Sequence, residues 1–453
     1  MTIKTKYVYR YLARVIVEAV TPLAVGSGER SILSDSLVAL DANGLPYIPG
    51  TALAGVLRHL SDGDLEDLFG YQSGKEGCGS KIIFSEARMI GHEGKVLDGL
   101  VCVDWSNSFY AHFRELPIRQ HVRMGHKGTA VKGGKFDEQV VYKGTRFCFE
   151  IEMVSEEESV SLFNSLLVKM FTSSFRLGGG LSKGFGEMKV VDCKTKILKL
   201  SEKADLDFYL SKSSSLACDW EGDYFSPESV SLDLIRYRVE LIPKDLFLFG
   251  SGLGDAEADI TPVREEVVVW DEDGLPAFSE QLVLIPVSSV KGALSHRTAF
   301  YWNKLNKHFA ENILENELYV GDNNPAVLAL FGSENPEFPQ RGAVFFSDMF
   351  GENSGKDKLI NHVAIDQFTS GAIEGALFSE KVIEGNHMRF SLKVDVRSEA
   401  YGERLVQEAF ELALKDLCSG YLPLGGGVNR GNGCFYGTLW RNDECILGKE
   451  AWV

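Results

Sequence analysis

An internal duplication constrains the fold of this chain more than any other feature. Two glycine-rich strings, at 177–186 and 424–433, share the pattern LGGGxx(K/R)GxG and lie 247 residues apart. Other short motifs pair in the same order, among them Gly26-Ser27-Gly28 with Gly250-Ser251-Gly252, Leu68-Phe69-Gly70 with Leu330-Phe331-Gly332, and His121-Val122 with His362-Val363. One shared tripeptide would be chance, but six collinear matches indicate two copies of one unit, about 1–195 and 235–445.

Each copy shows the same succession of hydrophobic patterns. In the first copy, alternation predicts strands at 10–20, 82–84, 147–154 and 187–191, and helical spacing predicts a helix capped by Thr51 and another over 160–171. In the second copy the corresponding elements are expected at 235–241, from 288, and at 344–346, 390–394, 404–418 and 435–439. The β-α-β-β-α-β order predicts an α+β protein with two ferredoxin-like, RNA-recognition-like domains in tandem. The expected domains are 1–195 and 235–453, joined by a connector at 196–234.

A long stretch within the first copy, about 106–143, exceeds what a compact fold requires, so we expect it to project. Its core, 114–135, is strongly basic, with Arg114, Arg119, Arg123, Lys127, Lys132 and Lys135 against the single acid Glu115. The second copy has a shorter and less basic counterpart at about 357–383. The two projections are therefore predicted to differ in charge.

Composition excludes several classes of protein. The net charge of −17 argues against a free-standing nucleic-acid-binding domain, although local basic patches can still bind phosphate. The sequence contains no run of eighteen apolar residues, so no membrane helix is expected. The first twenty residues lack the pattern of a signal peptide. The eight cysteines are scattered without a CxxC pair, so neither a disulfide framework nor a zinc site is expected. These features predict a cytoplasmic, multi-domain protein.

The glycine strings are the first candidate binding sites. They follow a helix and precede a strand, which is the reverse of the order in a P-loop, and they do not match the dinucleotide fingerprint. A tight helix-to-strand connection is one interpretation. Because both strings carry a base, Lys183 or Arg430, contact with a polyanion is the other.

Acidic residues near the first helix of each copy are the candidate catalytic groups. Asp35 lies nine residues after Gly26, and the same spacing from Gly250 selects Asp259. Asp35 also lies six residues before Asp41, and the same spacing before the matching Asp271 selects Glu265 instead. The counterpart of Asp35 in the second copy is therefore ambiguous. A lone aspartate of this kind is also compatible with a simple solvated surface position. No HExxH, GxSxG, Cys-His or zinc-deaminase pattern offers another catalytic centre.

Taken together, the motifs resemble the RAMP superfamily of CRISPR-associated proteins. The resemblance rests on the glycine string 178–186 and on the motifs Pro22-Leu23-x-x-Gly26-Ser27-Gly28, Asp35-Ser-Leu-Val, Gly44-Leu-Pro-Tyr-Ile-Pro-Gly50-Thr-Ala-Leu-Ala-Gly55-Val-Leu-Arg58, Leu68-Phe69-Gly70 and Phe84-Ser85-Glu86. The second copy carries weaker versions, and it departs from the pattern where Val287 follows Ile285-Pro286. The chain is most similar to the backbone subunit of type III effector complexes, fused in tandem as in subtype III-D.

This resemblance implies a function and a site. Backbone subunits of this kind hold a guide RNA, and a projecting hairpin, the thumb, kinks the guide–target duplex; 114–135 and 363–378 fit the two thumbs. An aspartate at the position of Asp35 cleaves the target RNA with Mg²⁺ or Mn²⁺, by attack of the ribose 2′-OH on the adjacent phosphate, and Asp35 is the expected metal ligand. Guide RNA, target RNA and other CRISPR-associated subunits are the implied partners, with no membrane. The implied RNA-binding residues are Arg58, Arg119, Arg123, Lys127, Lys132, Gly178, Gly179, Gly180, Lys183, Gly184, Lys291, Gly425, Gly426, Gly427 and Arg430.

Three other functions compete with the catalytic backbone subunit. The same fold without chemistry would be a scaffold or a cap at one end of the guide. A guide-processing endoribonuclease is similar in family but is expected to be basic and to work alone. An unrelated acidic enzyme with a nucleotide pocket is disfavoured by the reversed order of helix, glycines and strand.

Overall fold

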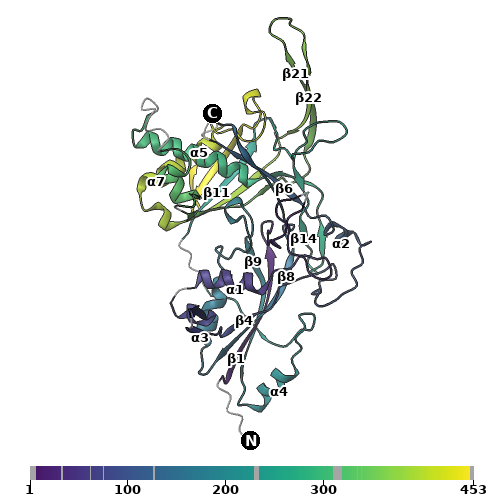
Figure 1. Cartoon of the computed structure of the whole chain (residues 1–453), viewed down its shortest axis with the longest axis vertical. Helices are drawn as coiled ribbons and strands as arrows, with labels where there is room; N and C mark the ends of the chain where they lie inside the picture. Colours follow the sequence, from purple (N-terminus) through teal and green to yellow (C-terminus); the bar gives the residue numbers. More distant parts are fainter. Residues whose placement is uncertain are drawn as a thin grey trace.

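The computed structural model describes residues 7–31, 34–61, 63–74, 76–125, 128–228, 234–309, 319–333, 335–337 and 339–448. Figure 1 shows two mixed α/β bodies arranged along the long axis of the molecule, with the N-terminal half at the bottom and the C-terminal half at the top. Each half has its own hydrophobic core. The strand pairs of the main sheets are antiparallel. Among the described helices, none has the length and hydrophobicity that crossing a membrane requires.

The first half is built on an antiparallel sheet with the strand order β10-β9-β1-β8-β4, and β5 also pairs with β8. Its strands are β1 (Tyr9–Ala19), β4 (Ile82–Phe84), β5 (Arg88–Met89), β8 (Arg146–Ser155), β9 (Met188–Lys199) and β10 (Asp223–Tyr224). Alternate residues of β1, from Tyr11 to Ala19, are fully buried, because successive side chains of a strand point to opposite faces. That face forms the core of the first half.

Two helices, α1 (Gly50–Leu60) and α3 (Val160–Met170), cover the buried face. α1 contributes Leu53 and Leu57, which lie four residues apart and therefore on one side of the helix. Pro49 occupies the N-cap position, so Thr51, which we expected to cap this helix, lies inside its first turn instead. Gly50, the first residue of the helix, packs against the backbone carbonyl of Phe84. A Cβ atom at this position would lie 2.5 Å from the carbonyl oxygen, so a larger residue would collide with it.

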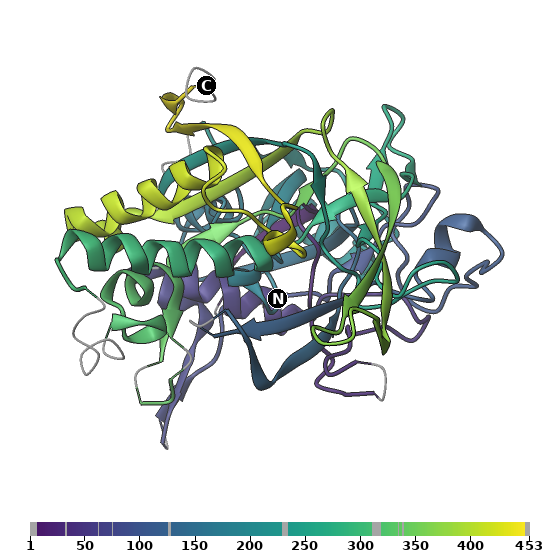
Figure 2. The ribbon, with the colours of Figure 1, turned by 90° about the horizontal axis from the view of Figure 1, so that it is seen from above.

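The second half repeats this arrangement with the strand order β19-β23-β11-β24-β25. Its strands are β11 (Leu234–Pro243), β19 (Val344–Phe346), β23 (Phe390–Arg397), β24 (Phe435–Arg441) and β25 (Glu444–Leu447). Its helices are α5 (Val287–Leu305), α6 (Pro325–Phe331) and α7 (Arg404–Cys418). Figure 2 shows α5 and α7 side by side along the outer side of this half.

Shorter elements complete the described chain. The helices are α2 (Ser108–His112) and α4 (Lys203–Ser211). The strands are β2 (Tyr71–Ser73), β3 (Glu76–Cys78), β12 (Leu246–Phe247), β13 (Arg264–Glu265), β14 (Val268–Trp270), β15 (Pro276–Phe278), β16 (Leu282–Ile285), β17 (Gly332–Ser333), β18 (Gln340–Arg341) and β20 (Met349–Phe350).

The segment between the two halves packs on the outer face of the first sheet. Arg14 of β1 is buried there, and its Nη2 donates to Oε1 of Glu150 at 2.7 Å. The indole Nε1 of Trp220 donates to the same oxygen at 2.6 Å. The connector predicted at 196–234 is thus held by buried polar contacts, and its strand β10 extends the first sheet.

Part of the second half completes the core of the first. The hairpin β14–β15 places Val268 in the first core and Phe278 against it, and the ring of Phe278 stacks on His112 with centroids 3.9 Å apart. Trp270 donates from Nε1 to the backbone oxygen of Gly144 at 2.7 Å. The two halves therefore interlock, because residues from one copy supply packing that the other requires.

Each half also carries a long two-stranded hairpin. The first joins β6 (Ile118–Met124) to β7 (Ala130–Gln139), and the second joins β21 (Lys356–Ile365) to β22 (Ala372–Glu384). The second hairpin projects from the top of the molecule in Figure 1. The first runs beside the second half, where Gln120 reaches Gly252. The stretch expected to project in each copy forms one of these hairpins. The second projects as expected (Figure 1), whereas the base of the first lies against the second half.

Candidate nucleic-acid interface

Asp35 lies at the base of the first hairpin. Its side chain is exposed, and Oδ2 accepts a hydrogen bond of 3.1 Å from the backbone N–H of Asp137 in β7. The next residue, Ser36, forms a parallel bridge with Glu138. The acidic loop is thereby fixed to the strand that leads back from the hairpin.

Asp259 occupies the same place in the second half. It is exposed, and Oδ2 accepts hydrogen bonds from the backbone N–H of Ser379 at 2.8 Å and from its hydroxyl at 3.1 Å. The next residue, Ile260, forms a parallel bridge with Glu380 of β22. These contacts make Asp259 the structural counterpart of Asp35.

The alternative candidate, Glu265, has a different role. It is 5% exposed, and its Oε2 accepts from Nε of Arg119 at 2.6 Å. Nη2 of the same arginine lies 3.2 Å from Oδ2 of Asp348. Burial raises the pKa of Glu265 above its ordinary value, although the charge of Arg119 opposes this shift. Glu265 therefore belongs to a buried ionic cluster between the halves, with no access for a substrate.

The burial of Arg119 also corrects its expected role in RNA binding. Only 4% of the residue is exposed, and both of its carboxylate partners come from the second half. The sequence could not distinguish it from exposed bases in the same stretch, because its partners lie more than 140 residues away. Arg119 joins the first hairpin to the second half.

A polar cluster anchors the first hairpin to the first glycine string. Glu138 is nine-tenths buried, and its carboxylate is 2.8 Å from Nε2 of His121 and accepts from Nζ of Lys183 at 2.7 Å. The ring of Phe136 stacks on His121, and the ammonium of Lys183 lies 4.6 Å from the centre of that ring. Burial alone would raise the pKa of Glu138, but the hydrogen bonds from His121 and Lys183 hold it below its ordinary value.

The second half repeats this cluster residue by residue. The carboxylate of Glu380 is 2.8 Å from Nε2 of His362 and accepts twice from Nη2 of Arg430, at 2.8 Å each. Phe378 stacks on His362, and the guanidinium of Arg430 lies 5.8 Å from the centre of its ring. Lys183 and Arg430, which we predicted to bind RNA, are thus already paired with buried carboxylates.

Glu138 and Glu380 were not among the residues predicted from the sequence. A signal was present, because Phe136-x-Glu138 and Phe378-x-Glu380 follow the matched pairs His121-Val122 and His362-Val363 at spacings that differ by one residue. The signal became recognisable only once the hairpins brought each histidine opposite its phenylalanine.

The glycine strings have a structural explanation in both halves. Gly178 and Gly425 have φ of +81° and +87°, and a side chain at either would collide with a backbone carbonyl, that of Ala24 or Leu248. The next residue donates its N–H to the same carbonyl at 2.7 Å in each case. Close backbone approach therefore requires glycine here before any ligand is considered.

The surroundings of the two strings differ at one equivalent position. A side chain on Gly184, with φ +93°, would collide with Val287 at the start of α5. Gly431, with φ +91°, has no atom within 4 Å of that position among the described residues. At Gly184 the first string is consequently covered by the second half, whereas the equivalent part of the second string is open.

The remaining predicted RNA-binding residues are spread over several elements. Arg123 and Lys132 are exposed on the first hairpin, and Lys127 lies outside the described residues. Arg58 is exposed in the last turn of α1, and Lys291 is half-buried in α5. Gly178, Gly179, Gly425 and Gly426 are exposed, Gly180 and Gly427 are half-buried, and Gly184 is buried.

Asp35 would offer its exposed carboxylate to a divalent ion. Among the described residues, no group of three or more histidines, cysteines, aspartates or glutamates is placed to hold a metal. Mg²⁺ commonly binds through one or two carboxylates, with water and substrate phosphates completing its shell. An exposed aspartate fits that mode, provided that RNA supplies further oxygen ligands.

Comparison with known proteins agrees with the duplication. The profile of the RAMP superfamily matches residues 16–189 and again residues 278–436, which together make up more than half of the chain. No curated protein gives a significant match. The two matched regions include both Glu–His clusters and both glycine strings, whereas β11 and the loop with Asp259 and Glu265 lie outside them. On this evidence the chain belongs to the RAMP superfamily.

Proposed function

We propose that this chain is a tandem backbone subunit of a type III CRISPR effector complex, which binds guide RNA and cleaves complementary target RNA at two positions. Membership of the RAMP superfamily supports the coarser part, a CRISPR-associated RNA-binding subunit. One observation carries the finer part. Asp35 and Asp259 are both exposed and both bound to the returning strand of a hairpin by the same backbone contact. Two equivalent acids imply two equivalent cuts.

We also assign each half to the ferredoxin-like fold. The strand orders β9-β1-β8-β4 and β24-β11-β23-β19 support this assignment, because in both the last strand in the chain lies beside the first. The fused arrangement favours subtype III-D. It belongs in a cytoplasmic complex, since its partners would be RNA and other CRISPR-associated subunits.

The proposed chemistry uses the 2′-OH of the target RNA as the nucleophile. A hairpin that distorts the duplex would allow this hydroxyl to reach in-line geometry with its own 3′-phosphate. Asp35 would take the proton of the hydroxyl or hold a divalent ion, and Mg²⁺ would supply charge neutralisation at the phosphate. The bond to the 5′-oxygen of the next nucleotide then breaks, which leaves a 2′,3′-cyclic phosphate and a 5′-hydroxyl.

Assembly with further subunits is supported by the unequal glycine strings. In the first half, the surface of the glycine string at Gly184 packs against α5 of the second half. The equivalent surface at Gly431 is open, and a head-to-tail contact of this kind does not close on itself after two units. We propose that a flanking subunit covers it.

A non-catalytic scaffold is the second candidate function. It is favoured by the hydrogen bonds of Asp35 and Asp259, since an aspartate that fixes a loop to a strand already has a structural purpose. The scaffold would hold guide RNA and neighbouring subunits without cutting.

Isosteric variants separate these two functions. Asp35→Asn retains an oxygen that can accept from the backbone of Asp137 but loses the charge, so the complex should assemble while one cut in the target RNA disappears. Asp259→Asn should remove the other cut, and Asp207→Asn on the exposed side of α4 is the matched control. Product mapping on sequencing gels, with and without Mg²⁺, gives the readout. If the Asp35→Asn and Asp259→Asn complexes both cleave every site at the wild-type rate, neither aspartate cuts the target and the chain acts as a scaffold.

A further inference from the structure

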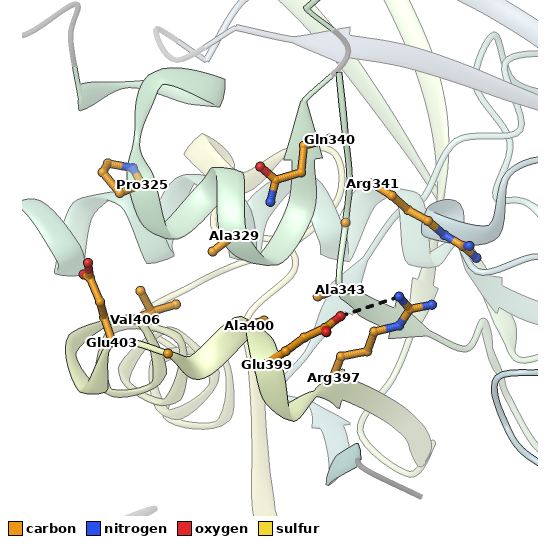
Figure 3. Close-up of a pocket in the computed structure, with 12 residues that line it drawn as sticks. Pro325, Ala329, Gln340, Arg341, Ala343, Arg397, Glu399, Ala400, Glu403 and Val406 are labelled. Atoms are coloured by element: carbon orange, nitrogen blue, oxygen red, sulfur yellow. Dashed lines mark ion pairs between the residues drawn. The ribbon is translucent and has the colours of Figure 1, made fainter. Parts of the chain in front are cut away.

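A pocket of about 350 Å³ opens in the second half among α6, β18 and the start of α7. Its lining includes the small apolar side chains of Ala329, Ala343 and Ala400. Figure 3 shows Arg341 and Arg397 close together at one end of the pocket. The pocket is therefore apolar along its middle, with two arginines and Glu399 at one end and Glu403 at the other (Figure 3).

The positive charge at this end is poorly neutralised. Arg397 pairs with Glu399 at 3.7 Å, but the carboxylate side chain is 73% exposed, so water weakens the pair. Within the described part of the chain, Arg341 forms no ion pair. Its Nη1 lies 2.8 Å from Nε2 of His59 in α1, and arginine can only donate, so the histidine nitrogen is the acceptor.

A third guanidinium adds to the imbalance. Arg341, Arg397 and Arg176 surround the ring of Phe345, at 6.0, 5.4 and 4.9 Å from its centre. Arg176 is buried and paired with Glu187, so it is not available to a ligand. Partial burial, together with the charges of Arg397 and Arg176, lowers the pKa of Arg341. An anion beside Arg341 would relieve this repulsion.

The fold itself does not require these two arginines. Pairing of β19 with β23 and of β4 with β8 makes Val154 the counterpart of Arg397 in the first half. Gly70 in the first half packs against the backbone of Gly79, and its counterpart Gly332 packs in the same way against the backbone of Arg341. Gly79 is therefore the counterpart of Arg341. The two arginines are therefore not part of the shared architecture. Contact with His59 accounts for one donor of Arg341, and the remaining unneutralised charge points to a ligand.

We propose that Arg341 and Arg397 bind the phosphate group of a nucleotide, with the attached sugar or base lying along the apolar wall of the pocket. A phosphate carries up to two negative charges and several acceptor oxygens, which suits two adjacent guanidinium forks better than a carboxylate does. The volume exceeds that of a phosphate alone and is within the range of small-ligand pockets. The site uses different elements from the acidic loops, so it does not depend on RNA cleavage.

Calorimetric titration of the full chain with inorganic phosphate and with adenosine monophosphate tests the site directly. We expect the wild-type chain to bind the nucleotide more tightly than phosphate, and the double variant Arg341→Gln/Arg397→Gln to bind it at least about ten-fold more weakly. Arg389→Gln is the matched control, because Arg389 is exposed just before the opposite end of β23. If the double variant does not fold, Arg397→Gln alone is used, since its partner is a weakly bound surface carboxylate.

Short RNAs distinguish the source of the phosphate. If the occupant is an RNA end, a 5′-phosphorylated oligonucleotide should bind more tightly than the same RNA with a 5′-hydroxyl, and Arg397→Gln should remove the difference. If it is a free nucleotide, only the mononucleotide should depend on the arginines. The proposal is overturned if the affinity of every phosphate-bearing probe is the same for the wild-type chain and for the arginine variants. It is also overturned if Arg341→Gln lowers the melting temperature, through loss of the contact with His59, without changing any of these affinities.

Discussion

The two halves share the cluster beneath each hairpin but differ in the surfaces around it. Glu138 and Glu380 each pair with a histidine of the hairpin and with the basic side chain of a glycine string, Lys183 or Arg430, at 2.7 to 2.8 Å. By contrast, the position of the buried Arg119 in the first hairpin is occupied by Ile360 in the second. Gly184 is covered by Val287 of the other half, whereas the equivalent Gly431 is open. Positions that hold a hairpin to its domain were therefore retained in both copies, whereas positions that join one half to the other occur once.

The hairpins diverge further toward their tips. The first carries exposed bases, including Arg123 and Lys132, and the second exposes apolar side chains, with Phe368 at the turn 96% exposed. Because no core depends on these tips, their chemistry was free to change while the bases of the hairpins stayed the same. The same element has thus acquired two different surfaces.

Breaking the buried contact between the halves should have the largest effect. Arg119→Ala leaves Glu265 and Asp348 buried without their cation, so we expect the free energy of unfolding to fall by about 3–5 kcal/mol. Arg123→Ala, on the same strand but exposed, should change it by no more than about 0.5 kcal/mol. Urea denaturation measures both, and equal effects would contradict the role of Arg119 as the link between the halves.

A pair of glycine substitutions isolates the contact at the first glycine string. Gly184 and Gly431 have nearly the same positive φ, so alanine should cost about 1–2 kcal/mol of backbone strain at either. Only Gly184→Ala also collides with Val287, which should add about 1–3 kcal/mol. The difference between the two variants in urea denaturation therefore reports the inter-half contact, and identical costs would show that the halves separate readily.

The anchoring cluster should contribute a smaller, pH-dependent amount. The pKa of Glu138 is lowered in the folded chain, so its stabilisation is present above the unfolded pKa of about 4.3 and is lost as the pH falls through the folded value. We expect Glu138→Gln to cost about 1–2 kcal/mol at pH 7 and progressively less below about pH 4. Glu380→Gln should lower the free energy of unfolding by more than Glu138→Gln does, because Glu380 is more deeply buried. A cost for Glu138→Gln that does not change with pH would contradict the ionic role.

Local patterns predicted most of the regular structure. The helices expected at 160–171 and 404–418 are present as α3 and α7, and the strands at 82–84 and 344–346 are β4 and β19. Their hydrophobic spacing reflects which side faces the core, and that signal is contained within each segment. The hairpin β14–β15 was not predicted as part of the first core, since its partners belong to the other copy.

The candidate site was predicted less completely. Spacing selected Asp35 but left Asp259 and Glu265 as alternatives, which the structure separates by the backbone contact of Asp259 to Ser379 and by the burial of Glu265. The basic stretch was read as a uniform surface, although Arg119 is buried. Charge along a sequence does not reveal which side of a strand faces another domain.

By itself, the sequence determined that the chain contains two similar units, where most elements of their repeated β-α-β-β-α-β order lie, and which aspartate begins the first acidic loop. These properties depend on periodicity and on repeated short motifs, which are local. The tertiary structure alone decided that the halves interlock, that Glu138 and Glu380 anchor the hairpins, and that Arg341 and Arg397 meet at one pocket. Each of these depends on side chains that are distant in sequence and come together only when the sheets, helices and hairpins pack.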